Sequence, residues 1–137
     1  MKDSCDFPAF TAYCLGEQML HIDMKKVKKL TALDVEQIYS CHEKIANGKK
    51  VYRLITFHGF IPMSDDAMAE AKKQSKRKME GASAFVVSNF ALRMSINFFM
   101  SFYKPQYPIN ICATKAEAVK WLTSVKKKMD VTEMELV

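Results

Sequence analysis

The chain has few glycines, and they form no phosphate-binding loop. Four are present in 137 residues, at Gly16, Gly48, Gly59 and Gly81. Their spacing builds neither a G-x-G-x-x-G fingerprint nor a Walker motif. A G-x-S-x-G nucleophile elbow is also missing. These absences argue against nucleotide binding through such loops and against the α/β-hydrolase type of chemistry.

The sequence also lacks a recognisable set of metal ligands or catalytic acids and bases. His21 and His42 have no second ligand at metal-binding spacing, because the neighbours Cys41 and His42 point to different sides of a helix. The carboxylates form no close pair in an apolar setting of the kind that general acid–base catalysis uses. We therefore expect a protein that is not an enzyme and that holds no metal and no cofactor.

Signals for disulfides, secretion and membrane insertion are scarce. The four cysteines, Cys5, Cys14, Cys41 and Cys112, contain no C-x-x-C pair, which is typical of reduced thiols. No charged start followed by an apolar run marks a signal peptide. The longest apolar stretch, 90–103, is interrupted by polar residues and is too short to span a bilayer. We expect a cytoplasmic protein without stable membrane insertion.

What the chain has in excess is positive charge, with a formal net charge of +6. The lysines concentrate at 25–29, 72–78 and 126–128. Two of these clusters fall at the C-terminal ends of expected helices, where cations complement the helix dipole. None is interleaved with aromatic residues that could stack on bases. The clusters are typical of a solvated basic surface, and we expect no nucleic-acid partner.

Short apolar runs alternate with segments of helical periodicity, which predicts an α/β domain with the order β-β-α-β-α-β-α-β-α. The expected strands cover 10–15, 19–24, 51–57, 82–87 and 109–113. The expected helices begin at Thr31, near Ser64, at Asn89 and at Thr114, and the second of them is expected to close at Gly81. This alternation predicts a mixed, mostly parallel sheet with about four helices. We assign one domain to residues 9–129, with flexible termini at 1–8 and 130–137.

Two residues near the end of the 51–57 strand are candidates for a regulatory or ligand site. His58 follows that strand directly, at the end where open α/β sheets place their ligands, although an ordinary turn residue is the alternative. Ser64 can cap the next helix. It could instead carry a phosphoryl group, which a helix N-terminus tolerates, although Asp65 and Asp66 would repel it. The N-cap is the favoured interpretation of Ser64.

The 89–104 helix carries more apolar surface than one sheet can cover. At about 100° per residue, one stripe holds Leu92, Ile96, Phe99 and Tyr103, and the adjacent stripe holds Ala91, Met94, Phe98 and Phe102. The surplus could lie under a neighbouring helix, against a second subunit, or along the wall of an apolar pocket. We predict a homodimer whose interface contains Met94, Phe98 and Phe102.

Several short motifs in the second half of the chain resemble one family. They are 84–87 (AFVV), 93–94 (RM), 97–99 (NFF), 104–105 (KP), Pro108, Ala118 and 121–122 (WL). Together they resemble the SpoIIAA-like, or STAS/SEC14-like, family of small uncharacterised bacterial proteins. The resemblance implies a STAS-like fold, in which helices surround a mixed sheet, and no established enzymatic activity.

The same resemblance bears on function. In STAS antagonists a phosphorylatable serine begins the second helix within a D-x-S-G-like signature. Residues 58–66 lack this signature, and only Ser64 lies near the corresponding place. We expect a non-catalytic, STAS-like regulatory or interaction module that contacts a protein partner or a second copy of itself. The alternative is a carrier of a small apolar or lipid ligand.

Overall fold

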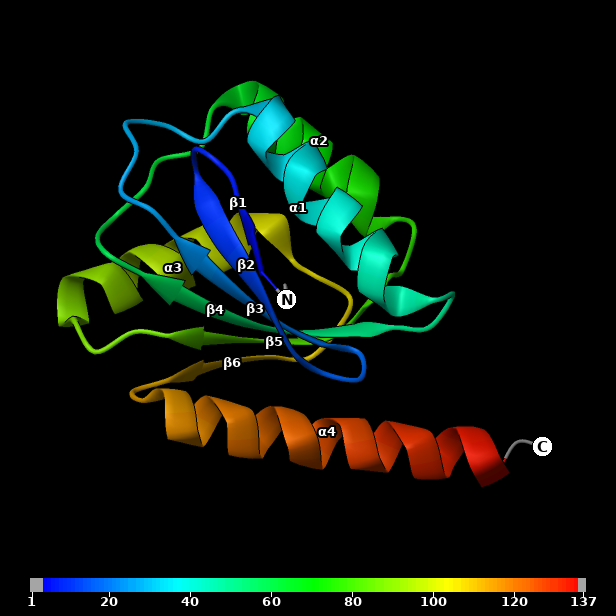
Figure 1. Cartoon of the computed structure of the whole chain (residues 1–137). Helices are drawn as coiled ribbons and strands as arrows, with labels where there is room; N and C mark the ends of the chain where they lie inside the picture. Colours follow the sequence, from blue (N-terminus) through cyan, green and yellow to red (C-terminus); the bar gives the residue numbers. More distant parts are fainter. Residues whose placement is uncertain (1–3, 136–137) are drawn as a thin grey trace.

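The computed structural model describes residues 4–135, apart from the side chains of Phe99, Phe102, Tyr103, Glu133 and Glu135. Within that range the chain forms one six-stranded sheet and four helices (Figure 1). The strands are β1 (Ser4–Asp6), β2 (Phe10–Gly16), β3 (Met19–Met24), β4 (Val51–Phe57), β5 (Glu80–Val86) and β6 (Ile109–Cys112). The helices are α1 (Ala32–Ala46), α2 (Asp65–Ser75), α3 (Phe90–Tyr103) and α4 (Lys115–Glu135).

The strands lie in the sheet in their order along the chain, from β1 at one edge to β6 at the other. The first three pair antiparallel, and β3 to β6 pair parallel. Each parallel strand is added at the same edge, and such crossovers are right-handed, so α1, α2 and α3 all lie on one face of the sheet. The last helix, α4, covers the other face beneath β4, β5 and β6 (Figure 1).

The two faces carry separate cores because neighbouring strand residues point in opposite directions. In β4, Val51 and Ile55 belong to the core under α1–α3, whereas Leu54 packs with Ala118 and Leu122 of α4. The expected α/β class with a mostly parallel sheet is confirmed.

The start of the chain differs from the expectation. Residues 1–8 were expected to contain no regular element, but Ser4–Asp6 forms the edge strand β1, paired with β2. The Thr11 hydroxyl donates to the Asp6 carboxylate at 2.8 Å, and Lys25 forms a salt bridge with the same carboxylate. These side-chain contacts hold the strand, and the Lys25 contact joins residues that are distant in the sequence. Residues 1–3 lie outside the described part of the chain.

The end of the second helix also differs. Gly81 was expected to close that helix, but α2 ends at Ser75 and Gly81 lies inside β5. A Cβ atom at Gly81 would stand 2.5 Å from Cζ of Tyr52. The glycine is required here by the close approach of an aromatic ring to the strand, and not by a helix end.

The last helix is longer than expected. The segment from 130 was expected to be irregular, but α4 continues to Glu135. Lys126 and Asp130 form an i, i+4 ion pair at 2.9 Å that spans the expected boundary. Such a pair supports helix across the turn that joins its two residues.

The starts of α1, α2 and α4 are those expected from the sequence. Thr31 and Asp34 form the reciprocal capping box of α1, and the Ser64 hydroxyl accepts from the Ala67 amide at 3.0 Å as the N-cap of α2. Thr114 accepts from the amide of Glu117, whose carboxylate accepts from the amide of Ala113. These local hydrogen bonds are readable in sequence because both partners lie within four residues.

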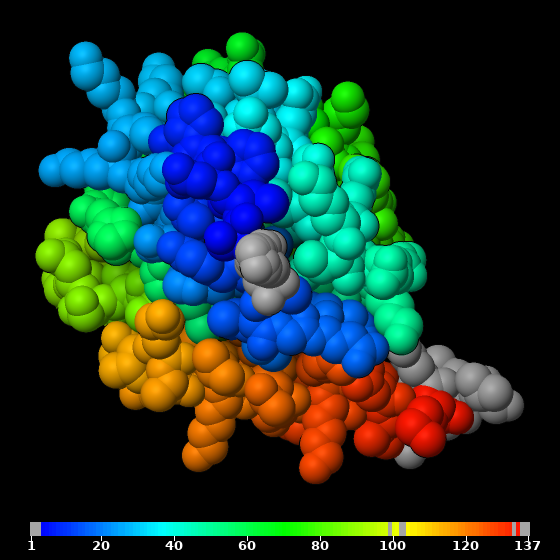
Figure 2. Space-filling model, in the orientation of Figure 1, coloured from blue at the N-terminus to red at the C-terminus, as the bar shows by residue number. Residues whose placement is uncertain are grey.

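The space-filling view shows the edge of the molecule formed by β1 and β2, in blue, with α4 along its lower border (Figure 2). Side chains of the 25–29 segment project from this edge, in light blue. Across the described residues 4–135, no helix combines the length and the apolar character needed to cross a membrane.

Candidate functional site

An apolar cavity of about 510 Å³ lies between the sheet and the three helices α1, α2 and α3. It is placed toward the carboxyl ends of the parallel strands, among the segments that leave them, which is where open α/β sheets place their ligands. Its lining comes from β3, β4, β5, the three helices and the loops between them: Met24, Leu30, Val35, Ile38, Tyr39, Arg53, Ile55, Phe57, Phe60, Ile61, Pro62, Met63, Met68, Ala71, Phe85, Leu92, Ser95, Ile96, Phe98, Met100 and Tyr107.

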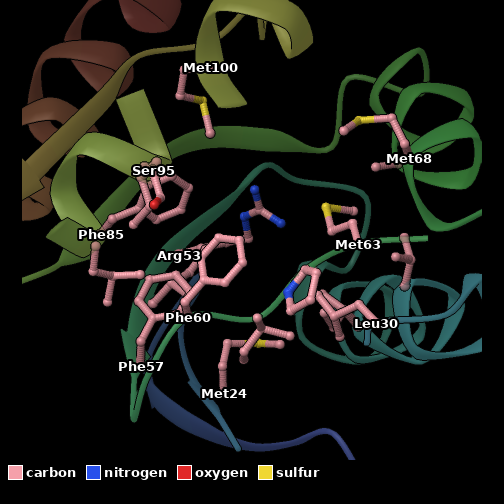
Figure 3. Close-up of a pocket in the computed structure, with 18 of the residues that line it drawn as sticks. Met24, Leu30, Arg53, Phe57, Phe60, Met63, Met68, Phe85, Ser95 and Met100 are labelled. Atoms are coloured by element: carbon pink, nitrogen blue, oxygen red, sulfur yellow. The ribbon is translucent and has the colours of Figure 1, made fainter. Parts of the chain in front are cut away.

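The floor of the cavity is the face of β4 and β5. Arg53, Ile55 and Phe57 of β4 point into it, as alternation along a strand requires. The ring of Phe57 meets that of Phe85 edge to face, with centroids 6.0 Å apart. Figure 3 shows the Arg53 guanidinium near the middle of the labelled side chains. The floor is therefore hydrophobic around a single cation.

One wall is built by the loops that follow β3 and β4. The amide of Leu30 donates to the carbonyl of Pro62 at 2.8 Å, and the amide of Ser64 donates to the carbonyl of Leu30 at 3.0 Å. This short bridge fixes Leu30 and Met63 beside the cavity, where Figure 3 shows them together. The wall is thus held by backbone hydrogen bonds and does not depend on side-chain packing alone.

The opposite wall is α3, which begins at the N-cap Asn89. Leu92, Ile96 and Met100 line the cavity, together with Ser95, whose hydroxyl donates to the carbonyl of Ala91. Part of the apolar surplus of this helix therefore forms a pocket wall, which was one of the three alternatives left open by the sequence.

The polar centre of the site is Arg53, which is 8% exposed. Its Nε donates to the hydroxyl of Ser83 at 2.9 Å, and its Nη2 donates to the hydroxyl of Tyr107 at 2.7 Å. The guanidinium also lies 6.0 Å from the ring centroid of Tyr39 and 5.7 Å from that of Tyr107. Residues of α1, of β5 and of the loop before β6 thus hold it in one orientation.

A buried carboxylate stands behind this cation. Glu80 is 2% exposed, and its Oε2 lies 3.9 Å from Nη2 of Arg53. The same oxygen accepts a hydrogen bond from the Tyr39 hydroxyl. The other oxygen, Oε1, is buried and has no hydrogen-bond partner among the described residues. Glu80 therefore offsets the charge of Arg53 from outside the cavity lining.

His42 adjoins this group from α1. It is fully buried, and neither ring nitrogen has a hydrogen-bond partner within the described part of the chain. Burial holds the pKa of His42 well below its ordinary value, and the positive charges of Arg53 and Arg77 lower it further. The imidazole is therefore neutral at physiological pH and sits beside the ring of Tyr39.

His58, a candidate from the sequence, does not line this cavity. It lies at the carboxyl end of β4 as expected, but its Nε2 contacts a carboxylate oxygen of Asp23 at 3.1 Å. Asp23 also accepts from the hydroxyl of Thr56 at 2.6 Å, and that hydroxyl contacts Nε2 of His21 at 2.9 Å. These side chains alternate with cavity residues along β3 and β4, so they belong to the opposite side of the sheet.

The charges in this second group follow from its contacts. Burial alone would raise the pKa of Asp23, but hydrogen bonds from Thr56 and His58 bring it below its ordinary value. Burial lowers the pKa of His21, and the positive charge of Lys115 acts in the same direction. The described residues contain no group of three or more His, Cys, Asp and Glu side chains that could hold a metal ion.

Of the other candidate residues whose side chains are described, Phe98 lines the cavity, and Ser64 and Met94 do not. Ser64 caps α2 directly after the loop that lines one wall, and it is not itself part of the lining. Met94 is 55% exposed on α3, outside the lining, whereas Phe98 is 68% exposed and lines the cavity as well. The side chain of Phe102 lies outside the described residues.

Arg53 and Glu80 were not predicted from the sequence as site residues. The signal for Arg53 was a cation in the middle of an otherwise apolar strand, Val51–Phe57, which is buried on both faces. A charged residue at such a position is rarely buried without a partner. Glu80 was not identified because the second helix was expected to continue to Gly81, whereas it ends at Ser75 and Glu80 begins β5.

A family model described as a domain of unknown function, DUF7793, matches residues 13–126. Among solved structures, an uncharacterised protein of the DUF3478 family with a SpoIIAA-like fold, from Shewanella loihica PV-4, is similar with a TM-score of 0.56 and 19% identity. The match covers 83% of this chain and 92% of that one. No curated protein matches the sequence.

The likeness to the Shewanella loihica structure confirms the SpoIIAA-like fold expected from the sequence motifs. At 19% identity this likeness concerns the fold alone. The match to the family model spans most of the chain, and the protein belongs to the DUF7793 family.

Proposed function

We propose that this protein is a non-catalytic binding protein for a small apolar ligand, held in the cavity between the sheet and α1–α3. The observation that carries the proposal is the cavity itself, about 510 Å³ lined mainly by aliphatic, methionine and phenylalanine side chains. Pockets that bury small ligands range from about 300 to 1,000 Å³ and are lined predominantly by such residues. The proposal takes up the carrier function that the sequence left as an alternative.

The lining also favours a ligand over an empty core defect. Packed interiors contain few voids larger than a water molecule, and apolar surface left without contacts loses dispersion energy. Four methionines, Met24, Met63, Met68 and Met100, face the cavity from four different segments. Methionine is flexible and polarizable, so it adapts to guests of differing shape.

The test uses N-phenyl-1-naphthylamine, a neutral apolar dye whose fluorescence rises when it leaves water. We expect saturable binding to the wild-type protein. Ser95→Phe should weaken it, because Ser95 lines the cavity and the larger side chain fills part of it. Ser101→Phe is the matched control, since Ser101 lies exposed on the same helix outside the lining and should leave dye binding unchanged.

Circular dichroism is recorded for all three proteins, so that loss of folding is separated from loss of binding. A folded wild-type protein that shows no saturable dye signal contradicts the proposal. Equal binding by wild type and Ser95→Phe contradicts it as well, because the dye would then be bound elsewhere.

A second function, contact with another protein molecule, is favoured by the outer side of α3. Phe90, Met94 and Phe98 are 76%, 55% and 68% exposed. Large exposed apolar patches on soluble proteins mark interaction sites, and a two-fold dimer buries one patch on both partners. We propose that a second copy of the chain covers this surface.

Light scattering tests the dimer. We expect wild type to have the molar mass of a dimer at micromolar concentration, and Met94→Glu to be monomeric with dye binding intact, because Met94 does not line the cavity. Val119→Glu places the same charge at an exposed apolar position on α4 and should remain dimeric. A monomeric wild type excludes this second function without affecting the first.

A further inference from the structure

We propose that the ligand is a single-chain amphiphile with a carboxylate head, bound so that its head meets Arg53 and its alkyl chain fills the apolar cavity. This inference rests on the proposed function and specifies the class of molecule bound. It follows from the charged group that the described residues present to the cavity, from the way that group is held, and from the chemistry of the remaining lining.

The charge of the lining has one sign. Of the described residues that line the cavity, Arg53 is the only one charged at neutral pH, and the other polar contributors are the hydroxyls of Tyr39, Ser95 and Tyr107. Tyr39 and Ser95 donate their hydroxyl protons to Glu80 and to the carbonyl of Ala91, whereas the Tyr107 hydroxyl accepts from Arg53 and keeps its own proton to donate. The guanidinium and the Tyr107 hydroxyl together match an anionic head with more than one acceptor oxygen. An ammonium head would instead be repelled by the guanidinium and would find no carboxylate in the lining.

The guanidinium is held in place before any ligand arrives. Ser83 accepts from its Nε–H, Tyr107 accepts from an Nη2–H, and its Cζ lies over the rings of Tyr39 and Tyr107. Arginine presents its donors in a rigid fork that matches the two oxygens of a carboxylate. A head group bound there makes charge-assisted hydrogen bonds without having to order a flexible side chain first.

Glu80 lies beside this cation at ion-pair distance and beyond hydrogen-bond distance. Its nearer oxygen is 3.9 Å from Nη2, longer than a hydrogen bond, and that oxygen is the one that accepts from Tyr39. At this separation Glu80 balances the charge of the guanidinium without forming a hydrogen bond to it. Glu80 also stands outside the lining, so a second carboxylate can approach from the cavity side.

The rest of the cavity suits an alkyl chain. Figure 3 shows Met63 and Met68 on one side of the Arg53 guanidinium, Met100 above it, and Phe57 and Phe85 on the other side. These side chains offer no hydrogen bonds to a polar tail. An unbranched hydrocarbon gains from burial in proportion to its length.

The experiment compares three ligands with the same ten-carbon chain, decanoate, 1-decanol and decylamine, as competitors of bound N-phenyl-1-naphthylamine at pH 8. For wild type we expect decanoate to bind at least about tenfold tighter than decanol, which is the effect of one charge-assisted hydrogen bond on affinity. Decylamine should be the weakest of the three. All concentrations stay below those at which the ligands aggregate.

Two variants assign the preference to Arg53. Glu80→Gln keeps the acceptor for Tyr39 and removes the competing negative charge, so the decanoate preference should increase. The double variant Arg53→Met with Glu80→Gln removes both charges and leaves no buried ion unpaired. It should bind decanoate and decanol equally while retaining the affinity for decanol. Glu80→Gln alone tests the inference if the double variant does not fold.

The outcomes separate this inference from the proposed function. If neither decanoate nor decanol displaces the dye from wild type, the ligand-binding function is contradicted together with the inference. If both displace it with equal affinity, the function stands and the carboxylate head is wrong. A preference that survives in the double variant, or that does not increase in Glu80→Gln, shows that Arg53 does not bind the head group.

Discussion

The ring of His42 packs against the ring of Tyr39 with their centroids 4.6 Å apart, on the inner side of α1. Tyr39 donates its hydroxyl to Glu80, which in turn faces Arg53. His42 completes this group as a fully buried imidazole whose ring nitrogens have no partner among the described residues. A neutral, unpaired histidine therefore adjoins the polar centre of the cavity, and its protonation is linked to folding.

Stability should decrease in mildly acidic solution because of His42. Its pKa in the folded protein is well below 6.5, whereas in the unfolded chain it is near 6.5. Below pH 6.5 the unfolded state therefore binds a proton that the folded state does not, so the free energy of unfolding rises with pH. The contribution is complete above pH 6.5 and is lost by up to about 1.4 kcal/mol per unit as the pH falls toward the folded-state pKa.

His42→Phe keeps an aromatic ring against Tyr39 and removes the titrating group. Urea denaturation between pH 5 and pH 8 should show a smaller loss of stability at low pH than in wild type. A residual slope is expected, because burial also lowers the pKa of His21. Identical pH slopes for wild type and His42→Phe would contradict this account of His42.

Ser64 is expected to act through the helix start. Ser64→Ala removes the acceptor of the Ala67 amide and should cost about 1 kcal/mol of stability. Ser64→Asp should preserve stability, since aspartate caps as well as serine. Thermal melts of the three proteins measure this. Phosphorylation of Ser64 in cells that changes partner binding would instead support a regulatory serine.

The local parts of the fold could be predicted from the sequence, and the cavity could not. Both the capping box at Thr31 and the cap at Ser64 depend on residues within one helical turn, so their pattern is visible in the chain. The edge strand Ser4–Asp6 has three residues and is stabilised by contacts with Thr11 and Lys25, which no local pattern reports.

The cavity arises from the order of the strands. Because the parallel strands are added at one edge only, three helices must share one face of the sheet, and the third, α3, forms a wall of the cavity. The sequence showed that the 89–104 segment had surplus apolar surface, and it left open what that surface would meet. His58 was placed at the correct end of β4, and the alternation of side chains along that strand turns it away from the cavity, toward the carboxylate of Asp23.

Gly81→Ala should destabilise the protein although alanine is a common residue. The added Cβ would lie 2.5 Å from Cζ of Tyr52, and Tyr52 is 2% exposed, so the ring has little room to move. Overpacking of this kind costs about 1–3 kcal/mol. Combining Gly81→Ala with Tyr52→Leu should cost less than the sum of the two single changes, because the smaller side chain admits the methyl group. Strict additivity in urea denaturation would contradict the contact.

Arg53 and Glu80 should be coupled in stability as well as in ligand binding. Both side chains are at most 9% exposed, so removing one charge leaves the other buried and uncompensated. For Arg53→Met alone we expect a loss of about 3–5 kcal/mol, the effect of breaking a buried pair from one side. Glu80→Gln should cost less, because the amide oxygen still accepts from Tyr39 and because Arg53 retains its bonds to Ser83 and Tyr107. The double variant should be more stable than Arg53→Met, since it buries no unpaired ion.

A double-mutant cycle measured by urea denaturation at pH 7 gives the coupling free energy directly. A cycle with no coupling would mean that water screens the two charges from each other, and the floor of the cavity would then be more hydrated than the burial of these side chains indicates.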